Sequence, residues 1–359
     1  MKQIVILYPA VRDVPNGGLK VVYDYANRLS EDNVKVNIVY ASYYPDIDKS
    51  LSLKVKSAIK YLYQKCFRQF KNCSWYNLNK RISEMYVWEY TTENVPEADI
   101  YIATAVTTAK YANKLIDHYK GKGFYFIQDY ESFICDDRPY VISTYRLPLK
   151  KIVISKWLKK FVEEMSAQDC ELVTNGFDSQ QYHLTIPIYD KNKYMVSMLY
   201  HTREAKDMPT GFEALKIVKQ HIPELTVNMF GVYDCPKEIP EWIHYTKNPT
   251  PEQHLKINNE SAIYLGCSKL EGWGLTVGEA MMCGQAVVCT DNKGYLEMAM
   301  DGYNALVSPV GDAQALADNI IKLIGRNDLR YRIAENGMEL IKQFDIKKSY
   351  QKFKEIIEL

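Results

Sequence analysis

Residues 262–290 read AIYLGCSKLEGWGLTVGEAMMCGQAVVCT, and the fold class follows from this stretch. The apolar run 262–270 predicts a buried strand, and residues 285–290 predict a second one. Between them, residues 271–274 form a glycine-containing turn, and residues 275–284 have the composition of a helix. Strands that alternate with helices in this way indicate a parallel sheet with covering helices.

The same alternation runs through the rest of the chain. Further strands are predicted at 3–9, 34–41, 100–105, 123–129, 194–200 and 225–231, and near 151. Further helices are predicted at 19–31, 211–221, 251–260, 312–325 and near the end of the chain.

Asn175 and Gly176 interrupt the alternation, and we place a domain boundary there. The sequence therefore predicts an α/β protein with two doubly wound, Rossmann-like domains, at 1–173 and 174–340. The remaining residues, 341–359, include SYQKFKEIIEL, which is typical of a helix.

The composition is that of an ordinary globular protein, with 47% hydrophobic and 25% charged residues. A net charge of +1 argues against a dedicated nucleic-acid-binding protein. Residues 1–171 nevertheless carry 25 Lys and Arg against 20 Asp and Glu, which can mark a surface for an anionic partner. The eight cysteines include no C-x-x-C pair, which argues against a zinc site and a disulfide framework. No apolar run approaches a membrane span of ~20 residues, so we expect a cytoplasmic protein.

Residues 54–81 carry eight Lys or Arg and no Asp or Glu. Apolar residues recur there at helical spacing, at Val55, Ile59, Leu62, Cys66 and Phe70. Such a basic amphipathic segment can lie peripherally on the anionic inner face of a cell membrane, or hold an anionic acceptor. The alternative is a surface helix whose apolar stripe joins the core while its lysines are solvated.

Two glutamates flank the turn that precedes the helix predicted at 275–284. In open α/β sheets, ligands bind outside the carboxyl ends of the strands. The amides of Gly274, Leu275 and Thr276 would lie at a helix N-terminus, where unpaired N–H groups favour phosphate. The carboxylates of Glu271 and Glu279 suit neutral hydroxyls instead. The pattern predicts a cradle for a nucleotide sugar, although a single glutamate there could merely complement the helix dipole.

From about residue 175 onward, the chain resembles the retaining nucleotide-sugar glycosyltransferases of glycosyltransferase family 4. The resemblance rests on the E-x7-E spacing and on its continuation, EAMMCGQAVVCTDNKGYLEMAMDGYNALVSPVGDAQALADNI. NGFD at 175–178 also resembles the N-G-[IV]-D of the family's domain junction. Gln285 and Ala286 stand where Gly or Lys and Pro are usual, and Ala305 stands where Gly is common. The resemblance implies the GT-B fold, with two domains facing across a cleft and 341–359 crossing back to the first.

The resemblance also implies roles for individual residues. Glu271 would contact sugar hydroxyls near the reacting carbon, and Glu279 would bind the ribose. Lys206 and Arg203 in HTREAKD would neutralise the leaving phosphates, although Asp207 stands where the family usually has Gly; surface salt bridging is the alternative. The donor-binding residues implied in this half are Arg203, Lys206, Gly231, Glu271, Gly272, Gly274, Leu275, Thr276 and Glu279.

In the first half, PNGGLK resembles the family's N-terminal glycine loop, so the amides of Gly17 and Gly18 could reach the donor phosphate. The segment YFIQDYESF resembles the Q-D-x-E of a subgroup that includes bacterial rhamnosyltransferases. Gln128, Asp129 and Glu131 are accordingly candidate acceptor-binding residues. Asp129 could orient the acceptor hydroxyl as a third catalytic residue beside the glutamate and lysine named above; the alternative is a helix cap.

These features predict a retaining hexosyltransferase with dTDP-rhamnose or a UDP-hexose as donor. The expected acceptor is a surface polysaccharide, such as a capsule, or a lipid-linked glycan. No cofactor or metal is expected, because no D-x-D motif occurs at a strand end and the helix amides with Lys206 can replace a cation. One alternative is a non-catalytic GT-B subunit, which would show eroded site residues. Another is a different sugar-nucleotide enzyme of this fold. An epimerase is not expected to carry E-x7-E followed by this glycine-rich helix, and a phosphorylase would carry a lysine for pyridoxal phosphate in a much longer chain.

Overall fold

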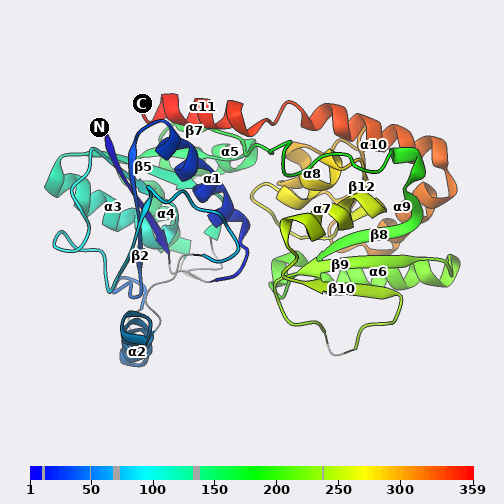
Figure 1. Ribbon diagram of the computed structural model, residues 1–359, viewed down its shortest axis with the longest axis horizontal. Coiled ribbons are helices and arrows are strands. Elements are labelled where there is room, and N and C mark those ends of the chain that lie inside the picture. Colours follow the sequence, from blue (N-terminus) through cyan, green and yellow to red (C-terminus); the bar gives the residue numbers. More distant parts are fainter. Residues whose placement is uncertain (10–12, 49, 68–72, 132–137, 237) are drawn as a thin grey trace. The chain divides into compact units, whose positions relative to one another are not determined.

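The computed structural model describes residues 1–9, 13–48, 50–67, 73–131, 138–236 and 238–359. The chain divides into two compact units, Met1–Thr174 with Tyr350–Leu359, and Asn175–Ser349 (Figure 1). The predicted boundary after residue 173 lies one residue from this division. The third predicted segment, 341–359, is shared between the two units.

The first unit contains a parallel sheet in the order β3-β2-β1-β4-β5-β6-β7. Its strands are β1 (Gln3–Pro9), β2 (Lys35–Ala41), β3 (Ser83–Val87), β4 (Ile100–Ala103), β5 (Lys122–Ile127), β6 (Lys150–Val153) and β7 (Cys170–Leu172). Its helices are α1 (Gly17–Glu31), α2 (Leu51–Phe67), α3 (Val106–Tyr119), α4 (Arg138–Tyr145) and α5 (Lys156–Ser166). The central strands β1 and β4 consist almost wholly of apolar residues, because both faces of such a sheet are covered by helices.

The second unit contains a parallel sheet in the order β10-β9-β8-β11-β12-β13. Its strands are β8 (Asn192–Tyr200), β9 (Thr226–Gly231), β10 (Ile243–Lys247), β11 (Ser261–Gly266), β12 (Ala286–Thr290) and β13 (Ala305–Ser308). Its helices are α6 (Met208–His221), α7 (Pro251–Glu260), α8 (Leu275–Met282), α9 (Ala313–Gly325) and α10 (Asn327–Ile341). In the core, α6 packs against α9, and α8 packs against α10 (Figure 1).

The last helix, α11 (Ile346–Ile356), begins in the second unit, and its residues from Tyr350 onward belong to the first. Within the first unit, the ring of Phe353 lies 4.7 Å from that of Tyr25 and 5.6 Å from that of Phe126. The Tyr350 hydroxyl donates to Asp32 at 2.7 Å. The end of the chain therefore completes the aromatic core of the unit in which the chain begins.

Gln285, one of the departures from the family pattern, is fully buried, and both polar atoms of its side chain form hydrogen bonds. Its Oε1 accepts from the Ser197 hydroxyl at 2.6 Å, and its Nε2 donates to both the carbonyl and side-chain oxygens of Asn258 at 2.8 Å. A buried amide with these partners does not carry the cost of an unpaired polar group. The departure is thus accommodated by hydrogen bonds inside the second unit.

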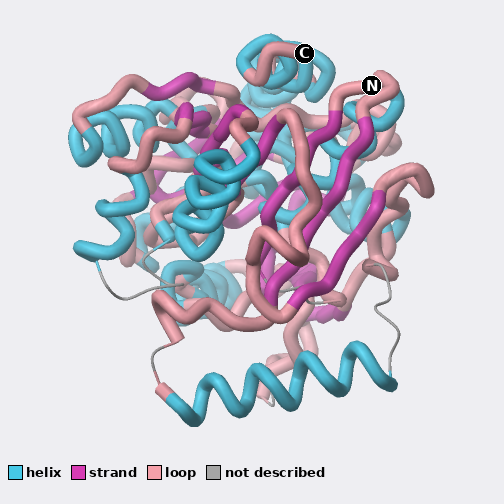
Figure 2. Tube along the Cα trace, turned by 90° about the vertical axis from the view of Figure 1, so that its left-hand side faces the viewer, coloured by secondary structure: helices cyan, strands magenta, loops and turns pink. Residues whose placement is uncertain are grey.

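Within the basic segment predicted at 54–81, residues 54–67 belong to α2 (Figure 2, the helix at the bottom), and residues 68–72 lie outside the described residues. The alternative in which its apolar stripe joins the core is wrong, because Val55, Ile59 and Leu62 are 50%, 65% and 57% exposed. Phe70 lies outside the described residues.

Candidate functional site

Three loops meet at one edge of the sheet in the second unit. They follow β8, β11 and β12, which are neighbouring parallel strands and therefore leave the sheet at the same edge. The loops carry Lys206, Glu271 and Tyr295. This is the carboxyl edge, where open α/β sheets bind ligands.

The Glu271 carboxylate is held by three side chains. Lys206 Nζ lies 2.6 Å from Oε1 and 2.8 Å from Oε2. The Ser268 hydroxyl donates to Oε1 at 2.7 Å, and the Tyr295 hydroxyl lies 3.4 Å from the same oxygen. The side chains of Lys206 and Glu271 are 15% and 13% exposed, so water screens their ion pair only weakly.

Burial by itself would raise the pKa of Glu271, because the charged form loses hydration. The charge and hydrogen bonds of Lys206, helped by the Ser268 hydroxyl and the charge of Arg203, outweigh burial and hold this pKa below its ordinary value. Glu271 is therefore ionised at neutral pH. Its Oε1 has two close donors, whereas among the described residues its Oε2 accepts from Lys206 alone.

Glycines beside Glu271 make room for the turn and for the Tyr295 ring. Gly274 has a φ of +100°, and a Cβ there would lie 2.5 Å from Cδ1 of Tyr295. A Cβ on Gly294 would lie 2.4 Å from the Glu271 carbonyl oxygen. Only glycine fits these two positions, so Gly274 has a packing role whether or not a ligand approaches it. Gly272 lies in the same turn, between Glu271 and Gly274.

The helix α8 begins directly after Gly274. The amides of Leu275 and Thr276 lie in its first turn, where a helix has no acceptors of its own. The Tyr264 hydroxyl donates to the Thr276 hydroxyl at 2.7 Å, which fixes that side chain. Glu279, one turn further along, is 5% exposed, and no described residue forms a hydrogen bond with its carboxylate.

The NGFD segment packs against the same helix. Phe177 is 5% exposed, and a Cβ on Gly278 would lie 2.0 Å from its Cζ, so the ring occupies the space that a side chain would need. The Phe177 amide donates to the Phe344 carbonyl at 2.8 Å, and the Ile346 amide donates back to Phe177 at 3.2 Å. This segment therefore holds α8 against the start of α11.

His201, which sequence reasoning missed, fixes the loop after β8. The Arg203 amide donates to its Nδ1 at 2.9 Å, and its Nε2 lies 3.4 Å from the Tyr233 hydroxyl. Burial, together with the positive charges of Lys206 and Arg203, lowers the pKa of His201 to about 4. The ring is therefore neutral at pH 7, with Nδ1 as an acceptor. The sequence could have indicated His201, because it directly follows the strand predicted at 194–200 and so lies at the ligand-binding edge.

Asp207 follows Lys206, at a position where the family usually has glycine, and the structure accommodates it. Its φ is 48°, in the left-handed region that favours glycine and that aspartate tolerates better than most residues. The Thr210 hydroxyl donates to its Oδ2 at 2.8 Å. The turn that presents Lys206 is thereby preserved.

Ser268, Asn292 and Tyr295 were also missed. Asn292 Nδ2 donates to the Ser268 carbonyl at 3.1 Å, and its Oδ1 accepts from the amides of Gly294 and Tyr295 at 3.1 Å. The Tyr295 hydroxyl in turn donates to the Ser268 hydroxyl at 3.0 Å. Asn292 and Tyr295 follow the strand predicted at 285–290, which could have indicated them, whereas Ser268 lies inside the strand predicted at 262–270. No spacing in the sequence shows that the three share one network.

The candidate residues of the first unit form a separate group. Gly17 and Gly18 open α1, whose N-cap Asn16 accepts from the Leu19 amide at 3.0 Å. Gln128 Nε2 donates to the Gly18 carbonyl at 3.2 Å, so the structure brings the glycine loop and the Q-D-x-E segment together.

The two carboxylates of that segment have structural contacts. Asp129 accepts from the Tyr130 amide at 2.8 Å. Glu131 is 7% exposed and accepts from the Val106 amide, the first of α3. Glu131 thus stabilises the N-terminus of α3, which the sequence alone did not indicate.

Gly231 closes β9 and is constrained by its neighbours. A Cβ there would lie 2.3 Å from the Tyr200 carbonyl oxygen, and its own carbonyl accepts from Asn248 at 2.7 Å. The position requires glycine because β8 passes so near.

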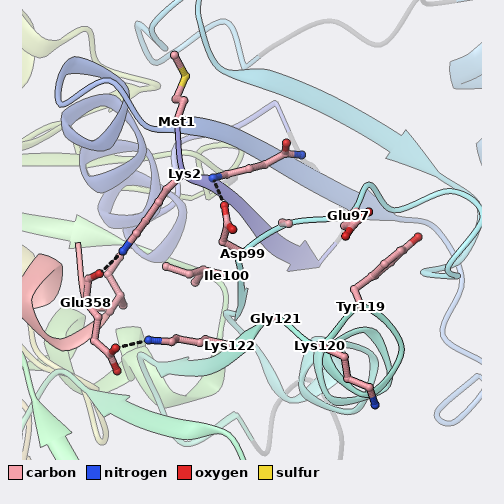
Figure 3. A pocket seen from close by; sticks show the side chains of 13 residues that line it. Met1, Lys2, Glu97, Asp99, Ile100, Tyr119, Lys120, Gly121, Lys122 and Glu358 are labelled. Atoms are coloured by element: carbon pink, nitrogen blue, oxygen red, sulfur yellow. Dashed lines mark hydrogen bonds and ion pairs between the residues drawn. The ribbon is translucent and has the colours of Figure 1, made fainter.

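A cavity of about 590 Å³ lies at the opposite edge of the first unit's sheet (Figure 3). Gln3, Ile100 and Lys122, which line it, each open or nearly open a strand. In Figure 3, Lys2 and Lys122 both reach Glu358, and the Gln3 amide donates to Asp99. Ligands bind at the carboxyl ends of the strands, whereas this cavity lies at their amino ends. We therefore interpret it as the place where the last residues of the chain pack against the sheet.

Among the described residues, no three His, Cys, Asp or Glu side chains are grouped to hold a metal ion. Within the same residues, we find no helix whose length and apolar character would let it traverse a bilayer.

Residues 188–340 match the family model described as glycosyl transferases group 1. The matched residues lie within the second unit, Asn175–Ser349. They contain the loops that carry Lys206, Glu271 and Tyr295, and the whole of α8. An uncharacterized glycosyltransferase of Methanocaldococcus jannaschii is 35% identical over 226 residues, which are 58% of this chain and 57% of that protein. The chain thus spans about half the length of this relative, and less of other curated relatives.

Solved structures resemble this chain over almost its entire length. HepE of Anabaena, solved in complex with UDP and glucose, has a TM-score of 0.76 and 15% identity, and 99% of each chain is covered. A sucrose-phosphate synthase from Thermosynechococcus elongatus has a TM-score of 0.73 and 12% identity, with 99% of this chain and 98% of that one covered. Identities this low show the fold alone, and they confirm the predicted α/β fold of the GT-B class.

Proposed function

We propose that this protein is a glycosyltransferase that moves a sugar from a nucleoside diphosphate sugar to a hydroxyl group. The observation that carries the proposal is Glu279, a residue only 5% exposed whose carboxylate accepts no hydrogen bond from any described residue. A carboxylate in a largely buried residue that no described protein donor uses is available to donors from a ligand. Such a group is expected where a ligand supplies the donors, and ribose hydroxyls are suitable ones.

The surroundings of Glu279 suit the rest of such a donor. The first amides of α8, at Leu275 and Thr276, and the helix dipole favour a diphosphate. Lys206 uses two hydrogen bonds on Glu271, and an ammonium has three N–H donors, so one is left for a phosphate oxygen. These groups would stabilise the negative charge that grows on the leaving diphosphate as the glycosidic bond breaks.

Glu271 has the properties of a positioning carboxylate in this proposal. Its Oε1 is taken by Lys206 and Ser268, and Oε2 is left to accept from a hydroxyl of the transferred sugar. Because it is pinned in an ion pair, we propose transfer with retention in which the leaving phosphate, and no protein carboxylate, takes the acceptor proton. The reaction would need no metal, since Lys206 and the α8 amides supply the positive charge.

We further propose dTDP-rhamnose or a UDP-hexose as donor. The solved complex of HepE with UDP and glucose supports a uridine nucleotide. The acceptor would be a surface polysaccharide or a lipid-linked glycan reached on the cytoplasmic side. Gln128 and Asp129, beside the α1 glycines, are the candidate acceptor-binding residues, whereas Glu131 is committed to α3.

Ligand-induced thermal stabilisation tests the donor site directly. UDP, dTDP, GDP and their sugars are titrated into wild type, Glu279→Gln, Glu279→Leu and the surface control Glu213→Gln. A ligand at 100 times its dissociation constant adds about 2.7 kcal/mol to the free energy of unfolding. We expect one nucleotide family to stabilise wild type and the control, and to stabilise both Glu279 variants far less. Without ligand, Glu279→Leu should be about as stable as wild type, because no described residue loses a hydrogen bond to the Glu279 carboxylate.

Transfer itself is measured with the donor so identified, in the presence of EDTA, and the anomeric configuration of the product is compared with that of the donor by NMR. Product of inverted configuration, or strict dependence on a divalent metal, would contradict the proposed chemistry. If no nucleotide stabilises the wild type, the non-catalytic subunit becomes the better interpretation.

A further inference from the structure

The helix α2 presents an uncovered apolar stripe. Leu51, Val55, Ile59 and Leu62, at positions i, i+4, i+8 and i+11, lie along one side of the helix. They are 77%, 50%, 65% and 57% exposed. Isolated exposed apolar residues are ordinary, but four in a line on a single helix mark an interaction surface. We call these four residues the α2 stripe.

Positive charge borders the α2 stripe. By the 100° advance per residue of a helix, Lys56 lies beside the stripe on one side, with Lys60 further round, and Lys54 and Lys65 lie on the other side, toward Tyr61. The helix contains no Asp or Glu between Leu51 and Phe67. Apolar side chains with lysine ammonium groups beside them match a surface in which an anionic layer covers an apolar layer.

A different face of α2 attaches it to the first unit. The Tyr61 ring lies 5.5 Å from that of Tyr86, at the end of β3, and 5.8 Å from that of Trp88. Lys54 Nζ lies 5.7 Å from the centre of the Tyr43 ring, which stacks on Trp88. These contacts lie on another side of the helix, so they attach α2 to the first unit while the α2 stripe stays exposed. Figure 2 shows the backbone of α2 as the helix at the bottom of the view.

We propose that α2 binds peripherally to an anionic lipid bilayer. The α2 stripe would enter the boundary between head groups and acyl chains, and Lys56 and Lys60 would extend to the anionic head groups. A second copy of the chain fits this surface less well, since pairing two α2 helices would bring their lysines together. Nucleic acid offers phosphates but no apolar layer for the stripe. This inference goes beyond the proposed function, and its test does not use activity.

Sedimentation with lipid vesicles tests the proposal. Full-length protein is mixed with vesicles of phosphatidylglycerol and phosphatidylcholine in equal parts, or of phosphatidylcholine alone. We expect binding to the anionic vesicles that weakens as NaCl rises from about 0.05 to 0.5 M. Lys56→Glu/Lys60→Glu and Val55→Gln/Ile59→Gln/Leu62→Gln should each weaken this binding by about tenfold or more.

Two matched controls lie in the second unit. Lys216→Glu changes an exposed lysine, and Val310→Gln changes an apolar residue that is 40% exposed. Both should bind vesicles like the wild type. Circular dichroism and the thermal midpoint of each α2 variant should match wild type, because the changed side chains are exposed.

Cys66 gives a second readout, because it is exposed near the C-terminal end of α2. An environment-sensitive fluorophore on Cys66, with Cys135 and Cys235 replaced by serine, should shift its emission to the blue on anionic vesicles only. The proposal is overturned if wild type binds both vesicle types equally, or if both α2 variants bind like the wild type. It is also overturned if sedimentation equilibrium shows a dimer that the triple Gln variant abolishes, since a second copy would then cover the stripe.

Discussion

Lys206 Nζ contacts both carboxylate oxygens of Glu271, at 2.6 and 2.8 Å, although the two residues are 65 positions apart. The pairing of β8 with β11 places their loops side by side. The contact sets the charge state of the site, because it keeps Glu271 ionised in a buried position.

Lys206→Met should leave the Glu271 carboxylate buried and uncompensated. We expect a loss of about 3 kcal/mol in the free energy of unfolding, measured by urea denaturation, and at least about 100-fold lower transfer activity. Adding Glu271→Gln to Lys206→Met should recover much of the stability but none of the activity. In the exposed pair of Lys216 and Glu213, Lys216→Met should cost under about 0.5 kcal/mol. If Lys206→Met and Lys216→Met lower the free energy of unfolding equally, the pair of Lys206 and Glu271 has no special role in stability.

His201 predicts a pH dependence of stability. Its pKa is lowered from 6.5 to about 4 in the folded protein, so between these values the unfolded chain binds more protons. Stability should therefore be complete above pH 6.5 and fall as the pH drops toward 4, by up to about 1.4 kcal/mol per pH unit. Glu271, whose pKa is also depressed, adds a loss at lower pH.

His201→Asn isolates the contribution of His201, since an amide oxygen can still accept from the Arg203 amide. Urea midpoints at pH 7 and pH 4.5 should differ less for this variant than for wild type. The same difference in both proteins would assign the pH dependence to other groups.

Alanine substitutions at two glycines with positive φ allow the cost of backbone strain to be distinguished from the cost of a steric clash. Gly274 and Gly311 have φ values of 100° and 81°, but only at Gly274 would a Cβ meet another group, the Tyr295 ring. Gly311→Ala should cost about 1 kcal/mol through strain alone. Gly274→Ala should cost about 1–3 kcal/mol more and should weaken nucleotide binding, because Tyr295 and the start of α8 must shift. Calorimetric unfolding and nucleotide titration measure the two effects; equal costs would contradict the packing role.

Phe353 connects the end of the chain to the first unit. It is 2% exposed and lies between the rings of Tyr25 and Phe126, so Phe353→Ala should cost about 3–5 kcal/mol. Lys352→Ala, at an exposed position of the same helix, should change stability by less than about 0.5 kcal/mol. Nucleotide-induced stabilisation should persist in folded Phe353→Ala, since Lys206, Glu271 and Glu279 belong to the second unit. A cost as small as that of Lys352→Ala would mean that α11 adds little to the core of the first unit.

Local patterns were enough to predict the elements around the site. The stretch 262–290 forms β11, α8 and β12, within a few residues of the predicted ends, because each segment's apolar content and length suit one kind of structure. The predicted strand ends earlier than expected, at Gly266, because the chain turns there into the loop that carries Ser268 and Glu271.

The same stretch also indicated Glu271, Glu279 and the helix amides as candidate site residues, because strand order alone places them at the carboxyl edge. Their roles in donor binding stay predictions. The resemblance pointed to Lys206 as well, but not to its partner.

Tertiary structure decided which groups touch. Sequence separation says nothing about the pairing of Lys206 with Glu271, or about the bonds that Ser268 and Tyr295 add, because these residues come from loops that only sheet pairing brings together. Glu131 serves α3 for the same reason. Whether the apolar side of α2 is buried also depends on what packs beside it, and its anchoring through Tyr61 leaves the stripe exposed. Periodicity is a property of the segment itself, whereas contacts and burial depend on residues distant in the chain.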